Sequence, residues 1–560
     1  MFFREKVSGA RTYLQLVENR WEVGKSRQRV VATIGRMDHL EESGELEAIL
    51  RSGARFSKKM IVISAHEKGE STTVATHGIG PGLVFERLWE QTGCQWELKA
   101  LLRERQFEFD VERVVFVTVL NRLFKPHSDR QCDKWKEEYR IEGAEEIFLH
   151  QYYRAMGWLG EELESKGQVD ALPFGPRCTK DLIEEGLFLR RRHLFSTLEL
   201  VFFDTTTIYF EGEGGQSLGQ RGYNKDHRPD LKQMVVGVVL DNEGRAVCCE
   251  MWPGNTADVK TLVPVVDRLR KRFGIQRVCI VADRGMISKE SIAELESEDR
   301  KWDYILGVRM RKVKEVRKDV LSRGGRYHEV HPPRVNKKAP SPLKVKEVRV
   351  EDRRYIVCYN EEQARKDEAD RQGIVAGLEE KLKRGDKSLV GNKGYRKYLK
   401  SKGKEEGFEV DWEKVKEDGR YDGKWVLTTS LDGLQASEVA LKYKQLLMVE
   451  RLFRSAKSLL ETRPVYHKRD ETIRGHVFCS FLALVLMNEL QDRLQAKGYD
   501  LEWSDVIRDL DRLQEVEIEQ DGKRFLLRSQ AKGTCGKVFQ VAGVALPPTL
   551  RQINPEESEP

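Results

Sequence analysis

Two short apolar segments, far apart along the chain, each run directly into an aspartate. Leu198–Phe203 is almost entirely apolar and ends at Asp204, and Val278–Ala282 ends at Asp283 in the same way. Apolar runs of this length are typical of strands that are buried on both faces of a sheet. If the two strands are parallel neighbours, both carboxylates lie at the edge where open α/β sheets bind ligands. Two carboxylates at that edge repel each other unless a cation lies between them.

The segments that follow the first apolar run alternate between strand and helix signals. After the strand that ends at Asp204 we expect strands Met234–Leu240 and Ala246–Met251, a helix over Val259–Phe273, the strand that ends at Asp283, a helix at about 286–297 and a strand at about 303–309. The order β-β-β-α-β-α-β indicates an α/β fold with a mixed sheet that is covered by helices. This order resembles the ribonuclease-H-like fold of polynucleotidyl transferases.

The segment 309–347 interrupts this alternation. It holds 13 Lys and Arg residues against 4 Asp and Glu residues, an excess that is larger than the net charge of +7 for the whole chain. Strands at about 345–350 and 354–359, a charged helix at 361–386 and a strand at Lys424–Thr429 follow it. We therefore expect a large basic, β-rich insertion in the catalytic core.

The remaining segments complete a division of the chain into six parts. Residues 12–17 and 27–34 alternate like the strands of a β-hairpin, and residues from about 100 to 195 show mainly helical spacing. The helical part is either a packed domain or a DNA-binding one. The expected parts are an N-terminal β-containing region at 1–100, the helical region at 101–195, the catalytic core at 196–308 and 431–495, the insertion at 309–430, and a C-terminal region at 496–560.

Composition excludes several classes of protein. The 560 residues are 39% hydrophobic and 34% charged, as in soluble proteins with more than one domain. Nine scattered cysteines form no CxxC pair, which argues against a zinc ribbon and favours a reducing compartment. The longest apolar run, Val477–Met487, is 11 residues long, whereas a membrane-spanning helix needs about 20. The N-terminus shows no signal peptide. We therefore expect a cytoplasmic protein that does not contact a membrane.

A third carboxylate lies on a long predicted helix at about 436–461. Tyr443, Glu450 and Lys457 are spaced seven residues apart, which places the outer two within roughly 20° of Glu450 around a helix axis. Arg454 lies roughly 40° from Glu450 on the same helix. This face is either an ordinary salt-bridged surface or, because its neighbours are apolar, a buried cationic site for a phosphate.

The combined residues resemble a known family. Tyr443-x2-Leu446-x3-Glu450-x6-Lys457 is similar to the Tyr-Arg-Glu-Lys signature of bacterial insertion-sequence transposases of the Asp-Asp-Glu (DDE) class. Asp204 and Asp283 match the first two acids, and Gly254–Asp258 and Tyr223–Gln233 match further segments. The resemblance implies that Asp204, Asp283 and Glu450 are catalytic and hold two Mg²⁺ ions, which Mn²⁺ can replace. Oxygen ligands of this kind suit such ions, and two metal ions suit phosphodiester chemistry. Leu446 departs from the family's arginine.

The resemblance also implies a set of DNA contacts. Tyr443, Arg454 and Lys457 would hold phosphates beside the scissile bond, with Arg284 and Lys225 as weaker candidates for backbone contacts. Trp425 stands where related transposases stack a tryptophan on a flipped base while the DNA end forms a hairpin. The alternative for Trp425 is an ordinary core residue.

The expected partners are the terminal inverted repeats of a transposon and a target DNA. The resemblance implies a homodimer on DNA, in the bacterial cytoplasm and associated with the nucleoid. Two alternatives stay open on the sequence alone: a relative that binds DNA without cutting it, and a metal-dependent nuclease of the same fold.

Overall fold

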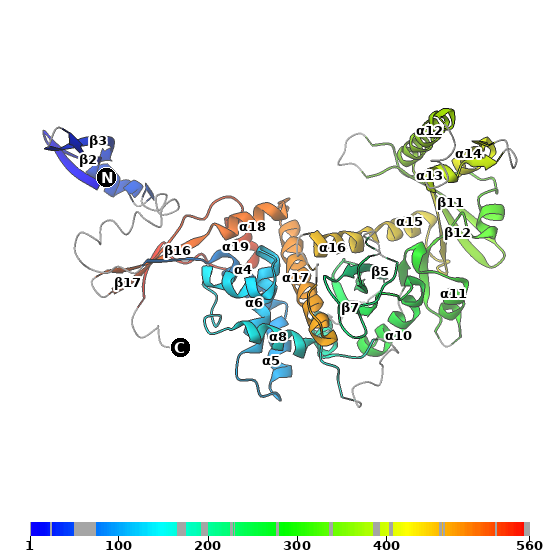
Figure 1. The fold of residues 1–560 in the computed structure, drawn as a ribbon, viewed down its shortest axis with the longest axis horizontal. Coiled ribbons are helices and arrows are strands. Elements are labelled where there is room, and N and C mark those ends of the chain that lie inside the picture. The colour runs from blue at the N-terminus through cyan, green and yellow to red at the C-terminus, as the bar shows by residue number, and fades with distance from the viewer. Residues whose placement is uncertain are drawn as a thin grey trace. The chain divides into compact units, whose positions relative to one another are not determined.

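A computed structural model divides the chain into two compact units (Figure 1). The first comprises Met1–Gln91, Ser128–Leu149 and Glu489–Pro560, and the second comprises Thr92–His127 and His150–Asn488. The division of the sequence into six parts stays a prediction. The structure describes residues 2–22, 25–46, 48–49, 74–164, 175–191, 200–223, 228, 230–275, 279–298, 300–334, 340–384, 393–401, 407–458, 462, 465–520 and 523–553.

The first unit contains two antiparallel sheets. One contains the two predicted strands, observed as β2 (Arg11–Glu22) and β3 (Lys25–Arg36), and a third strand that was not predicted, β1 (Phe2–Ser8). The three strands pair in the order β1-β2-β3. The other joins the two ends of the chain, because β4 pairs with β16 near the C-terminus. Its strands, in order across the sheet, are β18 (Leu550–Ile553), β17 (Lys523–Arg528), β16 (Gln514–Gln520) and β4 (Val74–Gly78). Helices α1 (Met37–Ser43), α4 (Gly80–Gln91), α7 (Asp129–Trp135), α18 (Trp503–Asp511) and α19 (Cys535–Ala542) complete the unit.

The second unit is built on one nine-stranded mixed sheet, in the order β10-β11-β12-β15-β9-β8-β5-β6-β7. Its first part confirms the predicted element order: β5 (Leu200–Tyr209), β6 (Gln233–Leu240), β7 (Ala246–Pro253), α10 (Leu262–Phe273), β8 (Cys279–Ala282), α11 (Lys289–Glu296) and β9 (Asp303–Val308). The three central strands β5, β8 and β9 are parallel, and their neighbours are antiparallel. An α/β architecture with a large mixed sheet is therefore observed.

The insertion continues this sheet instead of forming a separate one. Its strands are β10 (His328–His331), β11 (Leu343–Val350), β12 (Arg353–Tyr359) and β15 (Lys424–Thr429). Strand β15 pairs antiparallel with β9, and this pairing covers what would otherwise be an exposed sheet edge. The insertion also carries α12 (Glu361–Arg384), α13 (Lys393–Arg396), α14 (Trp412–Gly419) and a small hairpin of β13 (Leu399–Ser401) and β14 (Phe408–Val410).

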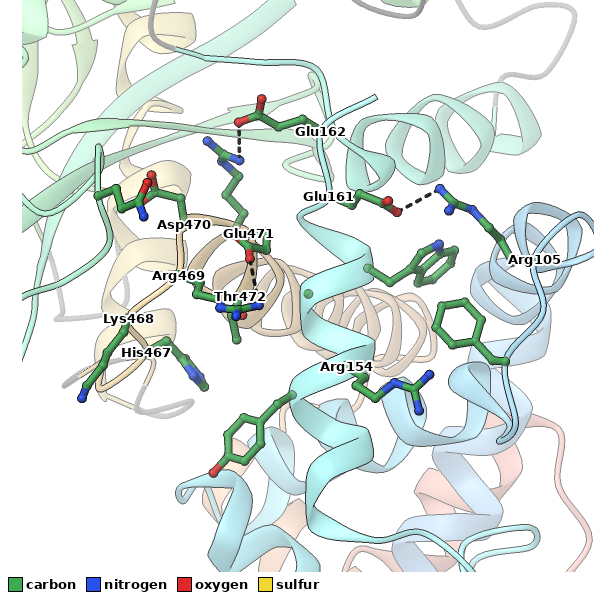
Figure 2. A pocket seen from close by; sticks show the side chains of 16 residues that line it. Arg105, Arg154, Glu161, Glu162, His467, Lys468, Arg469, Asp470, Glu471 and Thr472 are labelled. Atoms are coloured by element: carbon green, nitrogen blue, oxygen red, sulfur yellow. Dashed lines mark hydrogen bonds and ion pairs between the residues drawn. The ribbon is translucent and has the colours of Figure 1, made fainter. Parts of the chain in front are cut away.

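The helical region contributes α5 (Cys94–Leu102), α6 (Val111–Phe124), α8 (Leu149–Leu159) and α9 (Thr179–Arg191), in agreement with the helical spacing of residues from about 100 to 195. Helix α8 and the start of α17 (Asp470–Ala496) border an open cavity of about 1040 Å³ (Figure 2). Ion pairs span this cavity wall, among them Arg105–Glu161 at 2.9 Å and Arg474–Glu162 at 3.0 Å. The cations that line the cavity are thus largely neutralised by its own carboxylates.

Helix α9 is fixed to β7 and α10 by a buried network of charges. The side chain of Arg272 is 0% exposed and contacts Asp181 at 3.2 Å, Glu184 at 2.7 Å and Glu250 at 3.1 Å. Lys180 adds a second cation, 2.7 Å from Asp181. Each buried charge has an opposite charge beside it, which is the condition for burying ions at acceptable cost.

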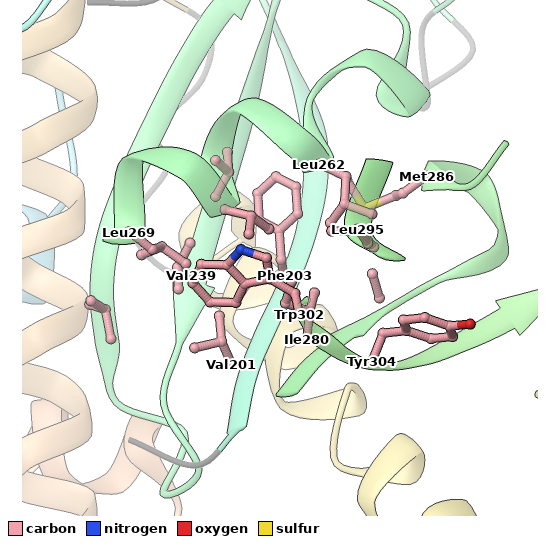
Figure 3. Close-up of a cluster of buried hydrophobic side chains, with 14 of the residues drawn as sticks. Val201, Phe203, Val239, Leu262, Leu269, Ile280, Met286, Leu295, Trp302 and Tyr304 are labelled. Atoms are coloured by element: carbon pink, nitrogen blue, oxygen red, sulfur yellow. The ribbon is translucent and has the colours of Figure 1, made fainter. Parts of the chain in front are cut away.

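One face of the sheet packs on α10 and α11 to form a hydrophobic core (Figure 3). Val201 and Phe203 of β5 and Ile280 and Ala282 of β8 point into this core. Side chains alternate between the faces of a strand, so Thr206 and Ile208 point the other way. There they meet helices α16 (Leu447–Ser458) and α17 around a small apolar cavity. By the same alternation, Asp204 belongs to the α16 face.

The long helix predicted at 436–461 is wrong as a single element. It is two helices, α15 (Ala436–Lys444) and α16, separated by a turn at Gln445–Leu446. The cause is a run of bonds to the third preceding carbonyl: Leu446 N donates to Tyr443 O at 3.0 Å, and Met448 N donates to Gln445 O at 2.8 Å. Such bonds tighten the chain and change the helical phase. Tyr443 is therefore not on a common helix face with Glu450 and Lys457.

Helix α17 contains the apolar run Val477–Met487. It is the one helix in the described ranges whose length and composition would allow it to cross a membrane. However, 89% of its most apolar window is buried inside the protein, as expected for a core helix. Every side chain of the run Val477–Met487 is buried.

Candidate active site

Asp204 and Asp283 meet at neighbouring positions of the central sheet. Strands β5 and β8 are parallel, and their register pairs Phe203 with Ala282, the residues immediately before the two aspartates. Both aspartates are half-buried. The predicted convergence of these two residues therefore follows from strand pairing alone, without any contribution from the loops.

The two carboxylates have different partners. Oδ1 of Asp204 accepts a hydrogen bond from the backbone N–H of Thr205 at 2.7 Å. Oδ1 of Asp283 accepts one from the hydroxyl of Tyr443 at 2.9 Å. Burial, together with the negative charges of Asp283 and Asp204, raises the pKa of Tyr443. The phenol therefore stays protonated and remains a donor to Asp283.

A third carboxylate beside this pair was not predicted as a site residue. Oδ1 of Asp258 accepts a hydrogen bond from the Thr205 hydroxyl at 2.8 Å. A Cβ placed on Gly285 would lie 3.9 Å from Oδ2 of Asp283 and 4.0 Å from Oδ2 of Asp258, so both carboxylates border the same small space. The available signal was the match of Gly254–Asp258 to a family segment, which gave Asp258 no role of its own.

The structure does not gather Glu450 with the two aspartates. Glu450 is exposed on the first turn of α16, which packs on β5 and β6 through apolar residues that include Val449 and Leu452. Within the described ranges, no three His, Cys, Asp or Glu side chains are close enough together to hold a metal ion. The donor chemistry of Asp204 and Asp283 fits Mg²⁺, which prefers hard oxygen ligands. The place of Glu450 in the site stays a prediction.

The predicted phosphate-binding residues are dispersed. Arg454 is exposed on α16, and Lys457 is half-buried beside the small apolar cavity under that helix. Leu446, which replaces the family's arginine, is buried at the turn between α15 and α16 and has a packing role here. Arg284 is exposed next to Asp283. Lys225 lies outside the described residues.

An open cavity of about 800 Å³ begins at Asp283 and extends along the insertion. A neighbouring cavity of about 1270 Å³ shares its wall residues Arg371, Asp422 and Lys424, so the two cavities adjoin, and together they are named the groove. Burial, with the like charges of Lys346 and Arg420, lowers the pKa of Lys424. The cations on the first cavity's wall are Arg284, Arg309, Arg311, Lys312, Arg371, Lys397 and Lys424.

Trp425 is half-buried on β15, opposite Cys358 of β12. Its neighbours Lys424 and Val426 point to the other face of the sheet, since side chains alternate along a strand. Trp425 does not line the described part of the groove that starts at Asp283.

Comparison with known proteins gives two family matches. The sequence model of the transposase DDE domain matches residues 196–486, and that of the IS1634 family transposase N-terminal domain matches residues 3–67. No curated protein matches the chain. Among solved structures, one similar chain is the piggyBac transposase in a synaptic complex with hairpin DNA, with a TM-score of 0.38 and 11% identity, covering 77% of this chain and 79% of that one. A likeness of that size does not establish a shared fold.

Proposed function

The chain belongs to the transposase DDE domain family, and on this premise we propose which residues carry out its chemistry. The protein is an insertion-sequence DNA transposase, an enzyme that cuts DNA and transfers strands with the help of divalent metal ions. We propose that Asp204, Asp283 and Glu450 hold those ions on a ribonuclease-H-like core. The observation that carries this proposal is the parallel pairing of β5 and β8, which ends at the two aspartates.

Divalent ions, of which we propose two Mg²⁺ with Mn²⁺ as a substitute, activate the attacking oxygen and stabilise the leaving oxygen in phosphodiester cleavage. The protein's task is to fix the ligands, because a small displacement of a catalytic group costs much of the rate. Asp204 and Asp283 suit this task, since each sits on or directly after a central strand.

Glu450 must approach the aspartate pair for the proposal to hold. Its helix already packs on β5 and β6, on the face of the sheet to which Asp204 belongs. The turn at Gln445–Leu446 separates α16 from α15 and provides a place where α16 can adjust. We propose that DNA and metal ions together draw Glu450 to the pair, with Arg454 and Lys457 on the same helix beside the bound phosphates.

The DNA substrate is proposed to follow the groove that runs from Asp283 along the insertion. Seven cations line its first cavity, against the carboxylates of Asp283, Asp367, Asp370, Asp418 and Asp422. A cationic wall next to the scissile site binds the phosphate backbone without reading its sequence. Arg284 belongs to this wall, and we propose that Lys225 adds to the same backbone contacts.

Removing groove cations should weaken DNA binding in a salt-dependent way. Lys312→Ala and Lys424→Ala should each lower the magnitude of the slope of log affinity against log salt by about 1. Each variant makes one phosphate contact fewer, so its binding releases fewer counterions from the DNA. Binding is measured by fluorescence anisotropy over a series of salt concentrations. Lys289→Ala, an exposed lysine on α11 away from the groove, is the control. Unchanged slopes for both groove variants would remove the groove from the DNA path.

We propose that cleavage passes through a hairpin at the DNA end and that Trp425 stacks on the flipped base. Trp425→Ala should then lower hairpin yield by about 5- to 150-fold while first-strand nicking persists, since stacking contributes about 1–3 kcal/mol per base. Denaturing gels separate nicked strands from hairpins. Trp412→Ala is the matched control, because Trp412 is also in the insertion and is 59% exposed. Equal hairpin yields from both variants would leave Trp425 as a core residue.

The proposed function is tested with an end-labelled duplex that carries the inverted repeats flanking the gene, in the presence of Mg²⁺ or Mn²⁺. Excised ends and strand-transfer products are expected. Nicks alone would indicate a simple nuclease, and binding without cutting would indicate an inactive relative. Size-exclusion chromatography with light scattering on the DNA complex tests the proposed homodimer. A cytoplasmic, nucleoid-associated location is part of the same proposal.

A further inference from the structure

The hydroxyl of Tyr443 donates its hydrogen bond to the carboxylate of Asp283, a proposed metal ligand. Tyr443 lies in the last turn of α15, which packs on β8 and β9, and its hydroxyl donates to Oδ1 of Asp283 at 2.9 Å. The family resemblance implies a phosphate contact for this tyrosine. The observed bond instead directs the hydroxyl to the sheet, toward the residue that follows β8.

A glycine on the neighbouring strand makes room for this bond. A Cβ placed on Gly307 of β9 would overlap the Tyr443 hydroxyl oxygen, and it would lie 3.2 Å from Tyr443 Cζ and 3.1 Å from the backbone nitrogen of Arg284. Gly307 is not among the glycines with positive φ, so its backbone conformation does not require glycine. Glycine at position 307 therefore leaves the space that the Tyr443 hydroxyl occupies.

The bond leaves one oxygen of Asp283 available. Among the described residues, no donor contacts Oδ2 of Asp283, whereas Oδ1 is occupied by Tyr443. A carboxylate that is bonded through one oxygen is held in a fixed orientation, and groups that orient a metal ligand in this way tune the affinity of the site. Oδ2 is then presented toward the side where Asp258 also lies.

We propose that Tyr443, admitted by Gly307, is a positioning residue that orients Asp283 for metal binding. This proposal rests on the proposed function, because it takes Asp283 to be a metal ligand. It assigns the tyrosine hydroxyl to the carboxylate and not to the DNA backbone. Loss of the hydroxyl should therefore change how the protein binds metal ions while leaving its affinity for DNA unchanged.

Tyr443→Phe tests this assignment, since it removes the hydroxyl and keeps the ring. The Mg²⁺ concentration for half-maximal cleavage should rise by about 10- to 100-fold, as for other groups that orient a metal ligand. Calorimetric titration of the full-length protein–DNA complex with Mn²⁺ should show the same loss without relying on activity. Tyr304→Phe is the matched control, because Tyr304 is on β9 and its hydroxyl bonds the carboxylate of Glu296 away from the site.

Gly307→Ala supplies an independent route to the same loss. Its Cβ would displace the tyrosine hydroxyl, so it should raise the Mg²⁺ requirement as Tyr443→Phe does. The double variant should be no worse than either single variant, because both remove one interaction. Additive losses in the double variant would contradict the proposal.

Two results separate failure of this inference from failure of the proposed function. If Asp283→Asn cleaves normally, Asp283 is not a metal ligand and both proposals fall. If Asp283→Asn is inactive while Tyr443→Phe keeps the wild-type Mg²⁺ and Mn²⁺ midpoints, only the positioning role is wrong. A weaker DNA affinity with unchanged metal midpoints would likewise overturn it and return Tyr443 to a phosphate contact.

Discussion

Asp204→Ala should leave a protein that folds and binds transposon-end DNA but cleaves it at least about a thousandfold more slowly. Metal-ion catalysis contributes several kcal/mol, and each 1.36 kcal/mol corresponds to a factor of about ten in rate. Asp204 lies on a central strand whose register with β8 places it beside Asp283, so the sheet fixes the position of its carboxylate. The measurement is single-turnover cleavage of a labelled duplex, with binding followed by anisotropy.

Asp267→Ala is a suitable control for this loss. Asp267 is on α10 of the same unit and pairs with Arg300 at 2.8 Å, away from the aspartate pair. It should cleave within a few-fold of the wild type. Cleavage by Asp204→Ala within tenfold of the wild type, with a normal folded state, would exclude Asp204 as a metal ligand.

The sequence was sufficient for the catalytic sheet because its strands and helices have strong local signals. The apolar runs that end at Asp204 and Asp283 need no tertiary information to be identified as buried strands. Alternation with amphipathic helices such as α10 then limits the topology to a few arrangements. The parallel pairing of β5 and β8 is one of these arrangements, and the structure shows it.

Tyr443 shows why helical periodicity was not sufficient for the third part of the site. Seven-residue spacing places Tyr443 near Glu450 only if the helix is continuous, and the turn at Gln445–Leu446 breaks it. A bond from Tyr443 to Asp283, 160 residues away in sequence, stabilises the phenol where α15 ends. Local propensity contains no information about such a partner.

Pairing between distant segments also explains what the sequence left unassigned. The alternation in β16, as in Glu515, Val516 and Glu517, indicates a strand, but the sequence does not show that its partner is the distant β4. The place of Asp258 in the site could not be predicted either, because it depends on a hydrogen bond from Thr205, which is 53 residues away. Both features depend on register, which single-sequence patterns do not determine.

The largest effect on stability is expected from Arg272→Met, which should lower the free energy of unfolding by about 3–5 kcal/mol. The reason is that Arg272 contacts the buried carboxylates of Asp181, Glu184 and Glu250 and has no exposed side-chain surface. Methionine fills a similar volume but leaves these charges short of a cation. Urea unfolding measures the loss, and Arg270→Met, an exposed position on α10, should cost under about 0.5 kcal/mol.

The pH dependence of that loss distinguishes an electrostatic cause from a packing defect. Burial opposes ionisation of Asp181, but Lys180, Arg272 and Arg268 lower its pKa. Its contribution to stability is therefore present above its ordinary pKa of about 3.9 and is lost as the pH falls through the depressed value. Burial raises the pKa of Glu184. As the pH falls, the folded state therefore binds a proton at Glu184 more readily than the unfolded state does, and this partly offsets the stability lost at Asp181.

Without Arg272, the pKa of both carboxyls in the folded state should rise. Acid unfolding of Arg272→Met should then begin at a higher pH than in the wild type, and the difference in stability between the two proteins should shrink as the carboxyls become protonated. A packing defect would instead give a difference that is independent of pH. Parallel unfolding curves for the two proteins between pH 3 and pH 7 would therefore show that the network contributes volume and not charge.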